Sequence, residues 1–208
     1  MIRKIIFITY LLLFMLVCLW INQLIHGDMP YIDQWSRKFV SQIADTPLYI
    51  FFSRITQFGG RKFLIPFTIT MSFVLFFMYK SLLPAIFFGI STYGGHMLNV
   101  VMKELVARER PSISIPLGAE GYSFPSGHAM NAIICYGILT YFITKKIRSK
   151  FIRIVLWIIA IIVIILVGIS RYVANVHFIT DVIAGFFFGS LYVLSLVYLF
   201  HRIKRFSK

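Results

Sequence analysis

The sequence has few acidic residues, few cysteines and little charge of any kind. Of its 208 residues, only seven are Asp or Glu, against 21 Lys and Arg, and charged residues make up 13% of the chain. A soluble domain usually carries about 25% charged residues, so this composition excludes an ordinary soluble protein. The two cysteines, Cys18 and Cys135, both lie in apolar segments and far apart in the sequence. We therefore expect them to be free and buried, and a disulfide framework is excluded.

Apolar residues take the place of the missing charge: 59% of the chain is hydrophobic and 17% aromatic. Six runs are long enough to cross a hydrocarbon core of about 30 Å; they are residues 5–25, 63–79, 82–102, 128–144, 154–170 and 182–200. The predicted fold class is all-α, a six-transmembrane-helix bundle that forms one integral-membrane domain over residues 1–208. The first run lacks a small-residue cleavage site, so we expect a retained helix rather than a signal peptide.

Basic residues gather where a cytoplasmic N-terminus would place the inner side of the membrane. They include Lys80, the run KKIRSKFIR at 145–153 and the tail HRIKRFSK at 201–208. This orientation obeys the positive-inside rule and puts both termini in the cytoplasm. It places the acids in or beside outer segments: Asp28, Asp33, Asp45, Glu104, Glu109, Glu120 and Asp181. Since helix-end cations that face anionic headgroups explain the net charge of +14, we expect no nucleic-acid partner.

The link at residues 26–62 has the pattern of a helix that lies on a membrane surface. Apolar residues recur at helical spacing, at Ile32, Trp35, Phe39, Val40 and Ile43. Polar residues stand between them, at Asp33, Arg37, Lys38 and Asp45. A second piece follows and ends at Gly59-Gly60. We therefore expect short amphipathic helices on the extracytoplasmic side, which serve either as an interfacial linker or in substrate entry.

Some cations fall on the outer side, against the topology rule; they are Lys103, Arg108, Arg110 and Arg171. Lys103 and Arg171 end two predicted helices, and Arg110 follows Lys103 closely, so these three should meet at one membrane depth. Fixed cations at one depth favour an anion site, because guanidinium groups hold phosphate oxygens in pairs. The alternative is that each cation pairs with a headgroup or with a nearby acid, such as Glu104, Glu109 or Asp181. We assign Arg108 to this alternative.

The stretch YSFPSGHAMNA, residues 122–132, reads as the start of a helix. Pro125 suits a helix start, Ser126 is a good N-cap, and Gly127 lets the backbone approach a ligand closely. The free N–H groups and the Ser126 hydroxyl would form an anion cradle, with His128 in the first turn beside it. A plain loop-to-helix junction with an inert histidine is the alternative.

A second histidine stands four residues before an acid, in the segment VHFITD. The spacing places His177 and Asp181 on one helical face or together across a helix start. A carboxylate that accepts from one imidazole nitrogen leaves the other nitrogen as a nucleophile or base. A buried Asp181 also requires a partner. The alternatives are a surface pair or a metal site, but the cations nearby would repel a divalent ion, so we expect no metal and no cofactor.

With these residues in place, the sequence resembles the type 2 phosphatidic acid phosphatase superfamily of integral-membrane lipid phosphatases. The first family motif reads Lys103, six residues, then Arg110-Pro111, and the second is Pro125-Ser126-Gly127-His128. The third combines Ser170-Arg171 with His177 and Asp181. The motifs lie within residues 103–181, whereas the six-helix layout covers the whole chain.

The resemblance implies a metal-independent phosphatase that acts on a lipid from the bilayer. His177 would attack phosphorus to form a phosphohistidine, Asp181 would orient it, and His128 would protonate the leaving alkoxide and then activate water. The phosphate would be held by Lys103, Arg110, Ser126, Gly127 and Arg171. The small size resembles bacterial members that act on phosphatidylglycerophosphate. The alternatives are an undecaprenyl diphosphate phosphatase and a non-catalytic binder or transporter of lipid phosphates.

Overall fold

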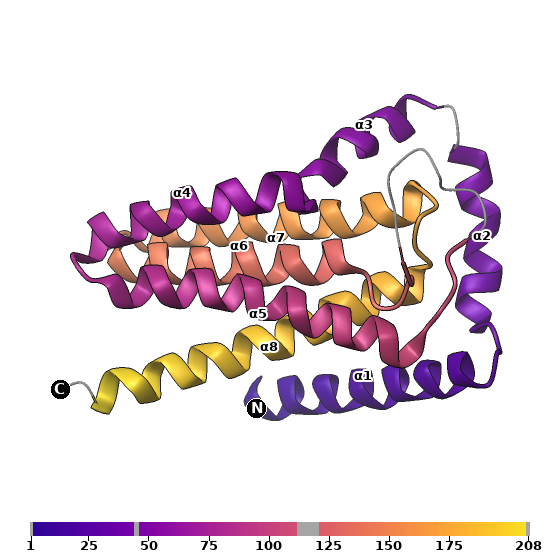
Figure 1. Cartoon of the computed structure of the whole chain (residues 1–208), viewed down its shortest axis with the longest axis horizontal. Helices are drawn as coiled ribbons and strands as arrows, with labels where there is room; N and C mark the ends of the chain where they lie inside the picture. The colour runs from indigo at the N-terminus through magenta and orange to yellow at the C-terminus, as the bar shows by residue number, and fades with distance from the viewer. Residues whose placement is uncertain (1, 44–45, 112–120, 207–208) are drawn as a thin grey trace.

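The computed structural model describes residues 2–43, 46–111 and 121–206, and these ranges contain helices and links only. Six long helices form a bundle (Figure 1), namely α1 (Ile2–Ile25), α4 (Arg61–Tyr79), α5 (Leu82–Val106), α6 (Gly127–Lys146), α7 (Lys150–Val173) and α8 (Ile179–Phe206). They include all six predicted spans, so the all-α bundle is confirmed. Two of the acids discussed above, Asp45 and Glu120, lie outside the described residues.

The six helices are not equally apolar. Among the described residues, α1, α4, α5, α7 and α8 are long and apolar enough to cross a membrane, whereas α6 is not. Polar residues such as His128 and Asn131 lower the hydropathy of α6. This helix packs against α4, α5, α7 and α8 and buries side chains along its length. Because its neighbours separate it from lipid, α6 does not need an apolar outer surface.

The outer surface of the bundle is apolar and suits lipid. Large side chains stand about half exposed along α7, including Ile158, Ile161 and Ile162. An apolar surface of this extent indicates a membrane rather than water as the surroundings. Cys18 is exposed on this surface, and only Cys135 is buried, so the prediction of two buried cysteines is wrong. The reason is that α1 lies at the edge of the bundle, where it contacts α5 and α8.

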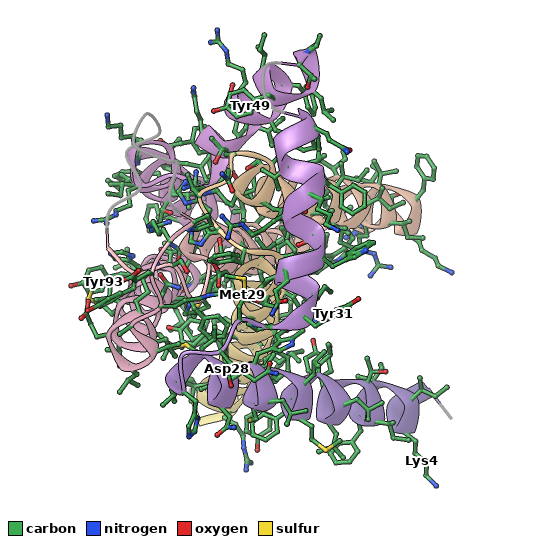
Figure 2. All side chains as sticks on the ribbon, turned by 90° about the vertical axis from the view of Figure 1, so that its right-hand side faces the viewer. Lys4, Asp28, Met29, Tyr31, Tyr49 and Tyr93 are labelled. Atoms are coloured by element: carbon green, nitrogen blue, oxygen red, sulfur yellow. The ribbon has the colours of Figure 1, made fainter. Side chains whose placement is uncertain are left out.

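The link at residues 26–62 folds into short helices at one end of the bundle, as predicted. Helix α2 (Tyr31–Ile43) crosses that end, and Figure 2 shows it nearest the viewer. Helix α3 (Pro47–Ile55) and the 3-10 turn η1 (Thr56–Gly59) then lead back to α4. On the exposed side of α2, the rings of Trp35 and Phe39 form an edge-to-face pair with centroids 4.9 Å apart.

The protein-facing side of α2 differs from the predicted one. Asp33 and Ser36 are fully buried together with Val40, whereas the sequence pattern placed Asp33 among the outward polar residues. These three positions share one helical face by their spacing. The hydroxyl of Tyr172 in α7 donates to the carbonyl of Ser36 and fixes this face against the bundle. The buried side of α2 therefore carries an acid toward the interior.

Close packing of α8 on α6 brings the first turns of both helices together. A Cβ atom at Gly185 would lie 2.6 Å from the carbonyl oxygen of Ser126, and one at Gly189 would lie 3.0 Å from that of Met130. Glycine is required at such distances because any side chain would separate the helices. The backbone N–H of Ser126 also donates to the carbonyl of Asp181 at 2.9 Å. The segment before α6 and the first turn of α8 therefore form one unit.

Candidate active site

The segments that carry the three motifs meet at the end of the bundle that α2 covers (Figure 1). Lys103 lies in the last turn of α5, and Arg171 lies in the last turn of α7. His128 lies in the first turn of α6, as predicted. Arg110 follows α5, and His177 lies in the short link before α8. The predicted meeting of separate helix ends at one edge of the bundle is therefore observed.

Backbone carbonyl groups hold Lys103 and Arg110 in place. The Lys103 ammonium group and Nη2 of Arg110 both donate to the carbonyl of Tyr122, the latter at 3.3 Å. Nε of Arg110 donates to the carbonyl of Gly121 and Nη1 to that of Val176, each at 2.8 Å. These carbonyl groups fix the positions of both cations, and a region that gathers fixed positive charge favours an anion.

Two buried donors of the site have no partner among the described residues. Arg171 is 3% exposed; its Nη1 donates to Oγ1 of Thr56 in η1 at 2.8 Å, but its Nε has no partner there. Ser126 occupies the N-cap position of α6 as predicted, yet its buried hydroxyl neither caps the helix nor bonds elsewhere in the described chain. A buried donor without a partner costs about 1–3 kcal/mol, so both groups are suited to an acceptor from outside the chain.

The two histidines belong to the same positively charged region. Both interact electrostatically with three cations, namely Lys103, Arg110 and Arg171. His177 is also an electrostatic neighbour of His128. The turn η1 packs against His128, because a Cβ atom at Gly59 would lie 3.0 Å from Cδ2 of its ring. The imidazoles therefore share one site rather than lying in two compartments.

Asp181 orients His177 across the start of α8. Its Oδ2 lies 3.4 Å from Nδ1 of His177 and accepts the backbone N–H of Phe178 at 2.8 Å. Nη1 of Arg110 lies 3.3 Å from Nε2 of His177. A guanidinium group can only donate, so Nε2 carries the lone pair and Nδ1 carries the proton. In this tautomer, Nε2 can act as a nucleophile or base.

Burial and nearby positive charge keep His177 neutral. Burial of the ring lowers its pKa well below the ordinary value of 6.5, and Arg171, Arg110 and Lys103 lower the pKa further. The lone pair on Nε2 is therefore available at neutral pH. The described residues contain no group of three or more His, Cys, Asp or Glu that could hold a metal ion. The clustered charges are positive, which suits an anion such as a phosphoryl group.

Arg108 forms the ion pair to which the sequence assigned it, and it has a second partner that the sequence did not predict. Its Nη1 lies 2.5 Å from Oδ1 of Asp181, and its Nη2 lies 2.7 Å from Oδ2 of Asp33. Asp33 stands 75 residues before Arg108 in the sequence. One sequence feature could have indicated this partner. Asp33 stands three residues before Ser36 and seven before Val40, so all three lie on one face of the helix.

Known proteins resemble most of this chain. Residues 84–205 match the family described as the PAP2 superfamily. The chain is 38% identical over 159 residues to phosphatidylglycerophosphatase B of Bacillus subtilis (strain 168), and this match covers 74% of this chain and 76% of that protein. It is 31% identical over 170 residues to an undecaprenyl-diphosphatase of Sulfolobus acidocaldarius, and this match covers 80% of this chain and 66% of that protein. The crystal structure of a transmembrane PAP2-type phosphatidylglycerolphosphate phosphatase from Bacillus subtilis matches with a TM-score of 0.78 and 30% identity, over 91% of this chain and 96% of that one.

Proposed function

The chain belongs to the PAP2 superfamily, and on that premise we propose that this multi-pass membrane phosphatase converts phosphatidylglycerophosphate into phosphatidylglycerol and phosphate. One observation carries the proposed chemistry. The neutral His177, with its proton directed to Asp181, has the lone pair of Nε2 in the cationic cluster beside Arg110. The choice of lipid rests on the 38% identity to phosphatidylglycerophosphatase B.

In the first step, Nε2 of His177 forms a bond to phosphorus while the bond from phosphorus to the lipid oxygen breaks. The negative charge of the bound phosphoryl group offsets the nearby cations and lets His128 take up a proton. His128 then gives this proton to the leaving alkoxide, so the lipid departs as an alcohol. The ring of His177 becomes a positively charged phosphohistidine. Asp181 stabilises this charge through Nδ1–H. Its carboxylate attracts the positively charged ring more strongly than the neutral ring.

In the second step, the now neutral His128 takes a proton from water, and the resulting hydroxide forms the new bond to phosphorus. The bond from phosphorus to Nε2 breaks, inorganic phosphate leaves, and His177 returns to its neutral tautomer. His128 ends the second step protonated, as it began the first. One histidine therefore acts as the nucleophile and the other as acid and then base.

The remaining motif residues would hold the three equatorial oxygens of the phosphoryl group; they are Lys103, Arg110, Arg171, the hydroxyl of Ser126 and the backbone N–H of Gly127. The unpartnered donors on Arg171 and Ser126 support this assignment, since a phosphate oxygen would satisfy both. Charge develops on these oxygens in the transition state, so donors that are already in place stabilise it without reorganising.

We expect the activity to persist without a metal ion, because the cations supply the charge that a metal would provide. A required metal contributes several kcal/mol, so its loss would lower the rate by roughly 10³-fold. Purified protein dialysed against EDTA should instead keep its initial rate of phosphate release. A large loss of rate that Mg²⁺ or Zn²⁺ restores would contradict the proposal.

The proposed function is tested by phosphate release from purified protein in detergent, with phosphatidylglycerophosphate, phosphatidic acid and undecaprenyl diphosphate compared at equal concentrations. We expect the highest kcat/KM on phosphatidylglycerophosphate. A higher value on undecaprenyl diphosphate would favour the alternative suggested by the 31% identity to an undecaprenyl-diphosphatase. No release from any of the three lipids would indicate a binder or transporter.

We also propose that the site faces the outside of the cell and that both termini are cytoplasmic. The basic link between α6 and α7 lies at the far end of the bundle from α2, which supports this orientation by the positive-inside rule. The same assay on right-side-out membrane vesicles checks the proposal. Phosphate should appear in the outer medium, and release into the vesicle interior would reverse the orientation.

A further inference from the structure

A buried polar network connects the surface helix α2 to Asp181. Its members, Asp33, Arg108, Thr180 and Asp181, are each 8% exposed or less. Asp33 comes from α2, Arg108 from the segment after α5, and the other two from the first turn of α8. Asp33 lies outside the family motifs and far from them in the sequence. A charged group buried this deeply requires partners, and each of these groups has them.

The guanidinium group of Arg108 binds two carboxylates at once. Nη1 donates to Oδ1 of Asp181 at 2.5 Å and to Oγ1 of Thr180 at 2.8 Å, while Nη2 donates to Oδ2 of Asp33 at 2.7 Å. Thr180 holds Asp33 as well, through its hydroxyl at 2.6 Å and its backbone N–H at 3.1 Å. The guanidinium carbon of Arg108 lies 3.8 Å from the centroid of the Phe178 ring. Arg108 is therefore held on several sides.

We propose that Asp33 and Arg108 are positioning residues that act on the nucleophile through Asp181. Arg108 binds Oδ1 of Asp181, which prevents the carboxylate from rotating and keeps Oδ2 directed at Nδ1 of His177. Asp33 in turn fixes Arg108, so α2 completes the support of the site. This inference rests on the proposed role of His177 and Asp181.

The charge balance gives Asp33 a second effect. If Arg108 paired with Asp181 alone, it would neutralise the carboxylate and weaken its interaction with the imidazole. With Asp33 present, one positive charge is shared by two carboxylates, and the group keeps a net negative charge of one. That charge faces the ring that becomes positive when Nε2 attacks phosphorus. Asp33 should therefore lower the barrier of the chemical step rather than strengthen substrate binding.

The substitution Asp33→Asn tests this proposal because it removes the charge and keeps the shape. We expect kcat to fall roughly 10- to 100-fold, as is typical when an outer-shell partner of a functional side chain is lost. KM should change little, since Asp33 does not touch the substrate. The matched control is Asp28→Asn, which changes an exposed acid in the turn before α2 (Figure 2) and should leave kcat unchanged. Size-exclusion profiles and thermal unfolding check that each variant is folded.

A double-mutant cycle separates positioning from a general loss of structure. Asp181→Asn alone should lower kcat by about 10⁴-fold, as for the orienting carboxylate of a catalytic triad. If Asp33 acts through Asp181, adding Asp33→Asn to that variant should cost little more. Losses that multiply in the double variant, or a folded Asp33→Asn variant with the kcat of the wild type, would overturn the inference.

If Asp33→Asn does not fold, Arg108→Lys takes its place in the same cycle, because an ammonium group keeps the charge but cannot bridge both carboxylates in the same way. The same two outcomes then support or overturn the inference. A wild-type protein that releases no phosphate from any lipid would refute the proposed function. An active wild type with a fully active, folded Asp33→Asn variant would refute only the role of Asp33.

Discussion

Replacing His177 by alanine abolishes turnover. We expect kcat to fall by roughly 10⁵- to 10⁶-fold, the scale seen when an enzyme loses its nucleophile. Arg110 and Arg171 cannot take over the attack, because a guanidinium group only donates, and His128 serves proton transfer in the proposed mechanism. Binding of the phosphate should largely persist. The measurement is phosphate release from the preferred lipid by purified variant and wild type.

The control for this prediction is His201→Ala, the same substitution at the other end of the bundle. Nε2 of His201 lies 2.9 Å from the hydroxyl of Tyr141, at the end of the bundle opposite α2. This variant should keep the wild-type kcat. Substantial turnover by a folded His177→Ala variant would show that His177 is not the nucleophile.

Replacing His128 by alanine should have an effect that depends on the leaving group. With a lipid substrate, kcat should fall by about 10²- to 10⁴-fold, the usual contribution of a general acid or base. An aryl phosphate releases a weakly basic phenolate that needs no proton, so its first step should be nearly normal. Its second step should remain slow, because His128 also activates the water.

Rapid-mixing kinetics of His128→Ala with a short aryl phosphate separate the two steps. We expect a burst of about one equivalent of phenolate, followed by slow turnover, which is the pattern of an accumulating covalent intermediate. Equal losses for alkyl and aryl substrates, without a burst, would argue against proton transfer by His128. The wild type should show a smaller burst, since its second step is faster.

The position of the site could be predicted from the sequence because its chemistry is local. Four outer cations oppose the topology rule, a helix start contains glycine and histidine, and His177 stands four residues from Asp181. Each of these features can be recognised in a short stretch of chain. The structure brings these stretches together at one end of the bundle. Their catalytic roles remain predictions that the substitutions above test.

The role of Asp33 could not be predicted from the sequence, because α2 contacts apolar material on two sides: lipid on one and the protein interior on the other. A helix on a membrane surface places aromatic residues such as Trp35 toward lipid and other residues toward the protein. The pattern of hydrophobic residues does not distinguish these two faces. The pattern therefore indicated an exposed position for Asp33. The structure instead buries it against Arg108, a partner 75 residues away.

Helix lengths also exceeded the apolar runs that predicted them. The third run ends at residue 102, but α5 continues to Val106 and ends where Ala107 adopts a left-handed conformation with φ of 49°. An apolar run measures the part of a helix that lies in hydrocarbon, whereas backbone hydrogen bonds continue until a cap ends them. This extension places Lys103 inside the last turn of α5, where its position is fixed.

The most direct test of a phosphohistidine at His177 is to trap it. The His128→Ala variant, stopped with denaturant soon after it is mixed with an aryl phosphate, should carry about one phosphate per chain. Peptide mass spectrometry should place that phosphate on His177, in a linkage that is stable to alkali and lost in acid. Phosphate on another residue, or continued turnover with no phosphate bound to the protein, would contradict the central claim.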